Sequence, residues 1–548
     1  MPVGRRLTAV LALVLSSGAI PASAAAPAAR HLEGPGGPLV LRPDGSVEVA
    51  TPSPRSSRLP APGADFEVEC LTGQDLVPTE TCRQHAWATR TEGSLGGDQV
   101  ATATGLAPDG SRLYATGYSP GPESAAGHVP RDLFTVAHDA ETGDELWTAL
   151  FDTPASWEEL PAGLAVTGDR VFVAGTGYWG AETRYDYTVV AYDAATGEEL
   201  WVARYDGPAH LDDQANAIAV EGDTVYLTGW SNGVGTSGDV ATVAIEAATG
   251  EVRWVGRYDH PHHDVDRGAA VTADGSRVYV TGDTWVRESE SPSDVPFDLI
   301  TAVYDAGTGE ELWHAIYAGP NSTWDYGSSI AAGGGRLYVS GTLAGTAVTE
   351  AATLAFDAAT GEMLWVDRYA GESDGPDTSS GLALHGDRLY LVGTTRRADL
   401  STNILTLAYD GATGSREWED FYEGPQGGGN LGVDVGVSPA GDLVYVTGLS
   451  SGITQCPSGF VCHGYFEDYA TYALEAAGGA RRWEARYVGE GIGHRTPSVV
   501  GVGYLALPPY DAPAGLAVAP DGSRIYVVGS SYWQDSGLDL VPVAYDTG

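Results

Sequence analysis

Short apolar runs separated by turn residues follow one another along most of the chain, and the same order of four runs returns repeatedly. One complete copy consists of residues 163–166, 170–175, 186–192 and 199–205. The runs are rich in β-branched and aromatic residues, and no helical period lies between them. This pattern predicts an all-β chain built from four-stranded units.

A tryptophan in the fourth run marks each copy. From Trp147 to Trp483, successive members lie 52 to 65 residues apart, a period typical of propellers and solenoids. The second run of each copy, with its aromatic residue, occurs eight times. We expect the strand-four tryptophans to pack at the boundaries between units. The full set is Trp87, Trp147, Trp201, Trp254, Trp313, Trp365, Trp418 and Trp483.

The last copy ends at Gly548, before a strand-four tryptophan is reached. The missing piece stands near the other end, because residues 87–93 align with residues 201–207 and precede the first complete unit. An N-terminal outer strand would close the ring and remove an open sheet edge. We therefore expect residues 83–548 to form an eight-bladed β-propeller.

The turn between the third and fourth runs has a constant chemistry, as residues 193–201 illustrate. Asp193 is suited to accept backbone N–H bonds within the turn, and Gly197 tolerates a positive φ. Trp201 follows at a fixed offset. A ring of this size buries roughly 150–250 Å² at a blade boundary, so its expected role is packing.

Residues 1–24 have the order of a signal peptide: two arginines, an apolar run and small residues before a cleavage position. Residues 25–82 are rich in Pro and Gly and predict a loosely packed extension. No cysteine follows the apolar run to take a lipid, and no later run is long enough to span a bilayer. We expect a secreted, extracellular monomer that is not inserted in a membrane.

The formal charge is 29 − 73 = −44, and all the basic residues are arginines. The absence of lysine excludes Schiff-base catalysis, and the negative charge disfavours nucleic-acid partners. Such a surface favours cations or basic partners, although an acidic exterior also serves solubility alone. The four cysteines are Cys70, Cys82, Cys456 and Cys462. In an exported chain they predict disulfides. Three pairings are possible, and we favour local bridges between cysteines that are close in sequence.

The turn text Ala-x-Asp-x-x-Thr-Gly-x-x-x-Trp resembles the tryptophan-docking motif of quinoprotein-type propellers with PQQ-like repeats. It is matched, with Glu for Asp in one copy, from Ala137, Ala191, Ala244, Ala355 and Ala408. The Trp313 copy has Val303 for Ala, and the Trp483 copy has Gly478 for Thr. The resemblance implies the propeller fold. It also implies that some members hold pyrroloquinoline quinone (PQQ) and calcium, whereas many hold neither.

The connections between runs two and three, and between run four and the next unit, are the variable ones. The tryptophans outside strand four lie in or beside them: Trp157, Trp179, Trp230, Trp285, Trp324 and Trp533. These side chains predict either a ligand-binding face or anchors that hold long loops on the blades.

Acidic residues recur on the same face. Glu159, Asp213, Asp264, Asp325, Asp377 and Asp511 stand near the start of strand one. A further series that includes Asp132, Asp186, Asp239 and Asp298 opens strand three. The first series predicts either a carboxylate ring that attracts Ca²⁺ or caps that brace every repeat.

One local cluster has the donors of a metal site: His260, His262, His263, Asp264 and Asp266. Histidines and carboxylates this close together also bind Zn²⁺ or Cu²⁺ without a physiological role. The sequence holds no adjacent Cys-Cys pair and no phosphate-binding loop. We therefore predict no catalytic residues and no bound PQQ, and we name calcium as the metal to test.

These features predict an exported, non-catalytic β-propeller that acts as a binding or scaffold module for a secreted protein or glycan, through its variable loops. The first alternative is an enzyme on the same fold, either a PQQ- and calcium-dependent dehydrogenase or a carbohydrate-active enzyme. The second alternative is a purely structural envelope protein.

Overall fold

The computed structural model describes residues 33–34, 37–41, 47–49, 55–58, 85–92, 97–122, 129–286, 297–319, 324–344, 349–371, 375–424, 429–451, 467–487, 511–533 and 537–548. The chain forms two compact units, Met1–Ser53 and Pro54–Gly548. In the first unit, β1 (Glu33–Gly34), β2 (Gly37–Leu41) and β3 (Val47–Val49) make an antiparallel sheet. Within the described residues, no helix is long and apolar enough to cross a membrane.

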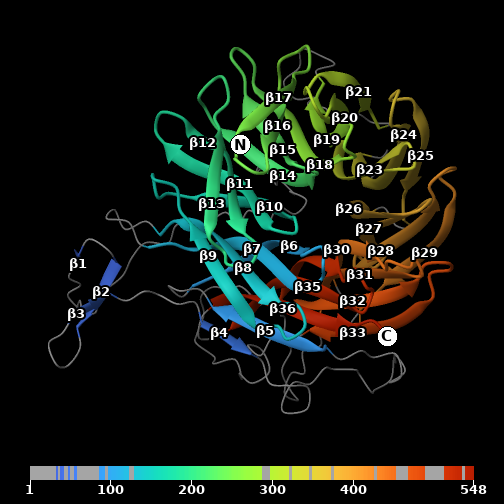
Figure 1. Ribbon diagram of the computed structural model, residues 1–548. Helices are drawn as coiled ribbons and strands as arrows, with labels where there is room; N and C mark the ends of the chain where they lie inside the picture. The colour runs from blue at the N-terminus through green and yellow to red at the C-terminus, as the bar shows by residue number, and fades with distance from the viewer. Residues whose placement is uncertain are drawn as a thin grey trace, which may run out of the picture. The chain divides into compact units, whose positions relative to one another are not determined.

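The second unit is an eight-bladed β-propeller, as the repeat predicted (Figure 1). Each of blades 1 to 7 is a four-stranded antiparallel sheet with its strands in chain order. Blade 1 contains β6 (Val100–Leu106), β7 (Arg112–Pro120), β8 (Arg131–Asp139) and β9 (Glu145–Phe151). Blade 2 contains β10 (Glu159–Val166), β11 (Arg170–Gly180), β12 (Arg184–Asp193) and β13 (Glu199–Tyr205). Blade 3 contains β14 (Asp213–Glu221), β15 (Thr224–Asn232), β16 (Gly238–Glu246) and β17 (Val252–Tyr258).

The remaining blades repeat this arrangement. Blade 4 contains β18 (Asp266–Ala273), β19 (Arg277–Trp285), β20 (Phe297–Asp305) and β21 (Glu311–Tyr317). Blade 5 contains β22 (Tyr326–Gly333), β23 (Arg336–Ala344), β24 (Thr349–Asp357) and β25 (Met363–Tyr369). Blade 6 contains β26 (Thr378–His385), β27 (Arg388–Arg396), β28 (Thr402–Asp410) and β29 (Arg416–Tyr422). Blade 7 contains β30 (Asn430–Val437), β31 (Leu443–Ser451), β32 (Glu467–Glu475) and β33 (Arg481–Tyr487).

Blade 8 joins the two ends of the propeller. It combines β34 (Ala512–Val518), β35 (Arg524–Trp533) and β36 (Gly537–Asp546) with β5 (Trp87–Glu92), so the predicted N-terminal closing strand is confirmed. Ala544 pairs with Trp87, and Val543 pairs with Ala88. A further strand, β4 (Arg55–Arg58), lies on the outer edge of β5. Part of the 25–82 segment, which we predicted to be a loose extension, therefore adds to the sheet.

The burial of each strand explains the apolar pattern. Strands two and three of a blade are covered on both sides, and β12 is buried from Asp186 to Tyr192. Strand four lies at the rim, and β13 is largely exposed or half-buried. The core of the propeller therefore consists of the paired inner faces of neighbouring blades, and the largest fully buried side chains are tyrosines, such as Tyr187 and Tyr304.

The turn before strand four joins one blade to the next. Asp193 Oδ1 accepts hydrogen bonds from the backbone N–H groups of Ala195 and Thr196, at 3.0 and 2.9 Å. Gly197 has a φ of 71°, and a Cβ there would lie 2.6 Å from the Trp147 ring of the preceding blade. Trp147 Nε1 also donates to the Ala194 carbonyl at 3.1 Å. The strand-four tryptophans from Trp87 to Trp418 dock in this way on the next turn, which requires glycine for both conformation and space.

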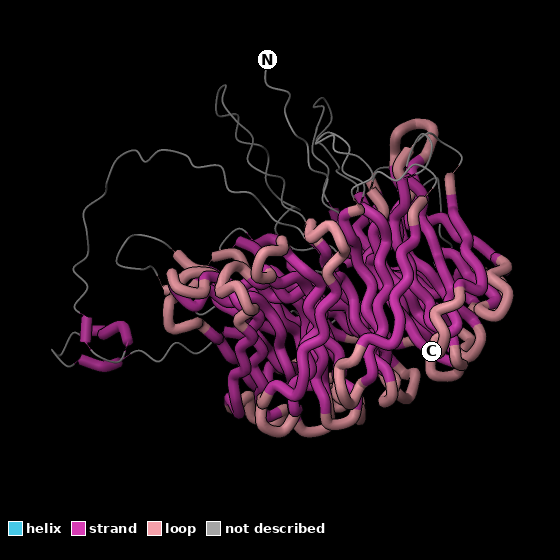
Figure 2. Tube along the Cα trace, turned by 90° about the horizontal axis from the view of Figure 1, so that it is seen from above, coloured by secondary structure: helices cyan, strands magenta, loops and turns pink. Residues whose placement is uncertain are grey.

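The connections lie at two faces of the ring, which Figure 2 shows edge-on. We call the face with the one–two and three–four turns the short-turn face. We call the face with the two–three and four–one connections the variable-loop face. Successive strands run antiparallel, so the end of strand four, the start of strand one and the start of strand three all lie at the variable-loop face.

Candidate functional site

The carboxylates at the start of strand one brace the four–one connections. Asp213 Oδ2 accepts a hydrogen bond from Gly207 N at 2.6 Å, and Oδ1 accepts one from Asn232 N at 3.1 Å. Asp325 and Asp377 make the same two kinds of contact in their own blades. Each side chain thereby satisfies two backbone donors that the loop leaves unpaired, which is a structural role.

The strand register shows which carboxylate of blade 4 is equivalent to Asp213. Asp213 pairs with Ser231 at the first position of β14, and Asp266 pairs with Thr284 at the first position of β18. Asp266, rather than Asp264, is therefore the equivalent carboxylate in blade 4. It accepts hydrogen bonds from His260 N at 2.8 Å and from Thr284 Oγ1 at 2.5 Å.

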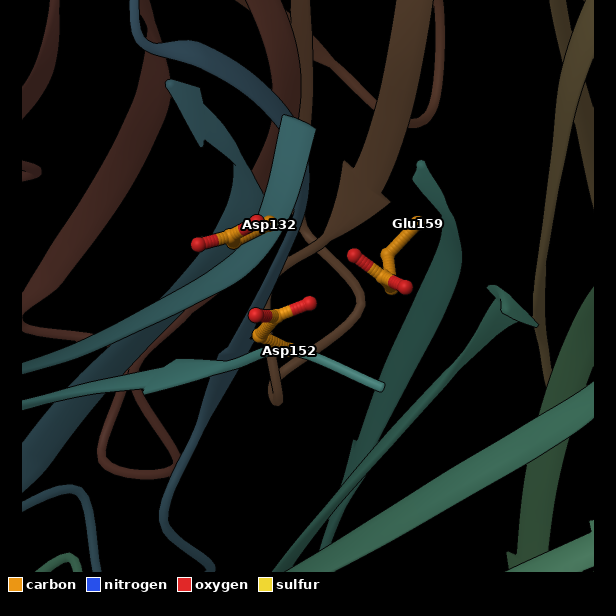
Figure 3. A group of neighbouring side chains, drawn as sticks. All are labelled: Asp132, Asp152 and Glu159. Atoms are coloured by element: carbon orange, nitrogen blue, oxygen red, sulfur yellow. The ribbon is translucent and has the colours of Figure 1, made fainter. Parts of the chain in front are cut away.

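Among the described residues, three groups of carboxylates meet at the variable-loop face, each at the junction of two blades. In every group one member opens strand three, one follows strand four and one opens strand one of the next blade. The ligand atoms within each group lie within 4.8 Å of one another. The groups are Asp132, Asp152 and Glu159 (Figure 3), then Asp186, Asp206 and Asp213, and then Asp239, Asp259 and Asp266.

Burial dominates the electrostatics of these groups. It raises the pKa of Asp186 and of Asp266 to about 7, because a carboxylate loses hydration when it is enclosed. An arginine of strand four partly offsets this effect in the second and third groups. Arg204 Nε donates to Asp186 at 2.7 Å, and Arg257 reaches Asp239 at 2.6 Å. Each of these two groups therefore contains one arginine–carboxylate ion pair, with the other carboxylates nearby.

The histidine cluster in the connection before blade 4 does not converge on one point. His263 Nδ1 lies 2.6 Å from Asp259 Oδ2 and is largely exposed, whereas the His260 side chain is buried. His260 and His262 pack ring to ring at 5.2 Å. Among the described residues, the triad of ligand atoms that includes Asp266 contains Asp239 and Asp259 rather than these histidines.

The variable-loop tryptophans differ in burial. Trp533 is 6% exposed and lies 4.4 Å beneath the Arg90 guanidinium of the closing strand. Trp179 donates to Thr188 Oγ1 at 3.0 Å and also packs under an arginine, Arg204. Trp230 is half-buried against Gly238. These three rings pack against strands and loops of the propeller.

Two of the six tryptophans are largely open to solvent. Trp157 is 44% exposed and its ring lies 6.2 Å from that of Tyr178. Trp324 is 54% exposed and packs on Phe297 at 5.5 Å, which in turn contacts Trp285 at 5.9 Å. The exposed ring in each group is thus supported from behind by other aromatic side chains, a rigid arrangement suited to a contact surface.

Other large apolar side chains are exposed in the same connections. Val129, Leu211, Val234 and Leu400 all lie there, and Val234 and Leu400 are the most open, at 76% and 70%. The other exposed large apolar residues that the structure describes belong to strand four at the rim. Among the described turns of the short-turn face, none holds such a side chain.

The strand-one side chains around the propeller axis offer poor partners for a polyanionic quinone. Arg267 is the only arginine in the eight strand-one segments, all of which the structure describes, and it pairs with Asp283 at 2.8 Å. Asn216 Nδ2 donates to the Gly268 carbonyl at 2.8 Å, and Thr104 Oγ1 donates to the Tyr114 carbonyl at 3.0 Å. These polar groups make their hydrogen bonds and ion pair within the chain.

Sequence reasoning found two members of each carboxylate group but not the one that follows strand four, for example Asp152. A usable signal was present, because Asp152, Asp206 and Asp259 each stand seven residues before the strand-one carboxylate. The predicted disulfide residues Cys70, Cys82, Cys456 and Cys462, and the predicted signal peptide, lie outside the described residues.

Comparison with protein families matches residues 134–287 and 298–487 to the family described as outer membrane protein assembly factor BamB. The two ranges span more than half of the 548 residues. No curated protein matches the sequence.

Several solved structures have a similar fold. BamB from Moraxella catarrhalis is 14% identical with a TM-score of 0.41, and the match covers 80% of this chain and 93% of that chain. Chaetomium thermophilum Sqt1 bound to the N-terminus of ribosomal protein L10 is 14% identical with a TM-score of 0.49, covering 82% and 98%. Quinohemoprotein alcohol dehydrogenase ADHIIG from Pseudomonas putida HK5 is 14% identical with a TM-score of 0.42, covering 82% and 76%. At these scores the likenesses support no functional argument.

Proposed function

Because the chain belongs to the family of the outer membrane protein assembly factor BamB, whose PQQ-like repeats build a β-propeller, we propose that it is a non-catalytic binding or scaffold module. The variable-loop face is its contact surface. The protein works without bound quinone, outside the cell, and as a monomer. A rigid ring that presents loops of differing length is well suited to this task.

The observation behind this proposal is the distribution of exposed apolar side chains. Among the residues that the structure describes, six large apolar side chains lie open in the connections of the variable-loop face of this strongly acidic protein: Val129, Trp157, Leu211, Val234, Trp324 and Leu400. Exposing such groups to water is unfavourable, and apolar side chains within a polar surface are the usual composition of a protein-binding patch. Aromatic anchors such as Trp157 and Trp324 often contribute most of the binding energy.

The net charge of −44 narrows the chemistry of the partner. An acidic propeller repels other acidic proteins and attracts basic ones over several ångströms of solvent. We therefore propose a partner with a basic surface around an apolar centre. A purely structural protein would have no need for the exposed aromatic residues on one face.

A site-specific photo-crosslinker tests this assignment. The crosslinker is placed at position 157 or 324 on the variable-loop face, with position 198, an exposed glutamate of the short-turn face, as the matched control. We expect one partner to be captured from positions 157 and 324 and not from 198. The recombinant partner should then bind Trp324→Ala at least about tenfold more weakly, the effect of losing an anchor residue. Equal capture from both faces, or stoichiometric PQQ binding with alcohol oxidation, would contradict the proposal.

A further inference from the structure

The junction of blades 1 and 2 lacks the arginine that its neighbours have. Arg204 stands opposite Thr188 in blade 2, and Arg257 stands opposite Ala241 in blade 3. The same position in blade 1, opposite Phe134, is Leu150. The three carboxylates of this junction are nevertheless kept. We call Asp132, Asp152 and Glu159 the blade 1 cluster.

Two buried side chains of the blade 1 cluster have an oxygen without a hydrogen-bond partner. Asp132 is 3% exposed and Glu159 is fully buried, and both Asp132 Oδ1 and Glu159 Oε2 are unpaired. The other Glu159 oxygen accepts a long hydrogen bond, 3.4 Å, from Thr153 N. Figure 3 shows the side chains of the cluster gathered around a common space.

Glu159 has a carboxylate oxygen without a hydrogen-bond partner, whereas its aspartate counterpart in blade 3 uses both of its oxygens. Asp213, its counterpart in blade 3, uses both oxygens on backbone N–H groups, including that of Asn232. The corresponding donor in blade 2, Tyr178 N, instead bonds to the Glu158 carbonyl at 3.2 Å. Glu159 therefore makes no bond to Tyr178 N, and its carboxylate lies beside Asp132 and Asp152.

The charge of the blade 1 cluster is not balanced by any described cation. Asp132 and Glu159 are both buried, and the third carboxylate, Asp152, lies within the same group of ligand atoms. The nearest arginine along the chain, Arg131, lies over the Tyr118 ring at 5.0 Å. Enclosed carboxylates in such a setting either hold a proton or bind a cation.

The ligands favour Ca²⁺ among the divalent cations. Ca²⁺ binds oxygen at 2.3–2.6 Å, so two ligands of one ion lie up to about 5 Å apart, and the oxygens of the cluster lie within 4.8 Å of one another. Mg²⁺ binds at about 2.0–2.1 Å, requires near-octahedral geometry and retains more of its water. Asp152 is exposed and gives the ion a path from solvent, and its Oδ2 is held by Ser156 Oγ at 2.7 Å.

We propose that the blade 1 cluster binds one Ca²⁺ ion, which takes the place of the arginine guanidinium found in blades 2 and 3. Asp132, Asp152 and Glu159 supply carboxylate oxygens, and water completes the coordination. The ion joins strand three of blade 1 to strand one of blade 2. It thereby stabilises the variable-loop face between two blades, as a structural cation.

Calorimetric titration of the full chain with CaCl₂, after removal of metals with EDTA, tests this site. The titration contains about 0.15 M NaCl and excess Mg²⁺, which screen the acidic surface. We expect one site with a dissociation constant of about 10⁻⁵–10⁻³ M, the range of moderate to weak calcium sites. Calcium should also raise the melting temperature.

Two variants separate the site from the surface charge. Leu150→Arg supplies a guanidinium as in blades 2 and 3, and Glu159→Gln removes one ligand charge at constant shape. Each should weaken calcium binding at least tenfold while the chain remains folded in EDTA, and Glu198→Gln on the short-turn face should leave binding unchanged. No calcium heat in the unmodified chain, or equal heat in Glu159→Gln, would overturn the proposal. If Leu150→Arg does not fold, Glu159→Gln alone decides.

Discussion

Replacing Trp87 by alanine should weaken the whole propeller, because this side chain joins the last blade to the first. Trp87 is 5% exposed, and its Nε1 donates to the Ala140 carbonyl at 3.2 Å. Its ring covers Gly143 of blade 1 and lies 6.0 Å from the ring of Tyr526 in blade 8. The substitution removes contacts on both sides of the closing junction.

The magnitude follows from the buried ring. Truncation of a buried tryptophan to alanine costs about 3–5 kcal/mol, and we take about 4 kcal/mol here. The unfolding entropy is about 2.1 cal/mol/K per residue, or roughly 1 kcal/mol/K over the roughly 460 residues of the propeller. The expected fall in melting temperature is therefore about 4 °C if the ring unfolds as one unit.

Differential scanning calorimetry measures this shift. Trp157→Ala is the matched control, because the ring is 44% exposed and its loss should change the melting temperature by less than about 1 °C. Trp201→Ala, which removes the Nε1 bond to the Ala247 carbonyl at an interior boundary, should resemble Trp87→Ala. An unchanged transition in Trp87→Ala, with a clear fall in Trp201→Ala, would refute the closing role of the N-terminal strand.

Three further predictions concern single positions. Gly197→Ala should lower the free energy of unfolding by about 3 kcal/mol, because it combines strain at positive φ with a clash against the Trp147 ring. Gly222→Ala is also at positive φ but in open space, so it should cost only about 1 kcal/mol. Denaturant titration compares the two variants. Burial lowers the pKa of His138 to about 4, so the unfolded chain binds more protons between that pH and about 6.5. Stability should fall by up to about 3 kcal/mol as the pH drops through this window, and His138→Gln should flatten the fall in pH-dependent melts. Arg257→Gln should lower the free energy of unfolding by about 3–5 kcal/mol, because it leaves the buried Asp239 without its ion-pair partner. Denaturant titration measures this loss, and an unchanged stability would contradict the pairing.

The strands and turns were readable from the sequence because their causes are local. The residues of β13 (Glu199–Tyr205) were predicted with the observed bounds, and Asp193 bonds the turn as its chemistry required. The closing strand was also predictable. The last repeat lacks its fourth strand, and an extra fourth strand precedes the first repeat, so the two ends of the propeller can complete one blade. The pairing of β4 with β5 had no such signal, because residues 55–58 are not part of the repeat.

The candidate sites depended on packing that no local pattern contains. Trp533 and Trp324 both stand at the variable-loop face, yet one is 6% exposed under Arg90 and the other is 54% exposed. Whether a loop tryptophan faces the blade or solvent depends on which neighbouring side chains fill the space behind it. The sequence could therefore name the ligand-face candidates but could not separate the anchors from the exposed rings.

By itself, the sequence determined the all-β class, the eight repeats, the docking tryptophans and the acidic character of the protein, because each follows from residue type and short spacing. Only the tertiary structure decided that Asp132, Asp152 and Glu159, which belong to two blades, share one space. It also gave meaning to Leu150, because a missing arginine matters only once the register shows which carboxylates it would have paired. Charge balance is a property of three-dimensional neighbours, and the fold selects those neighbours.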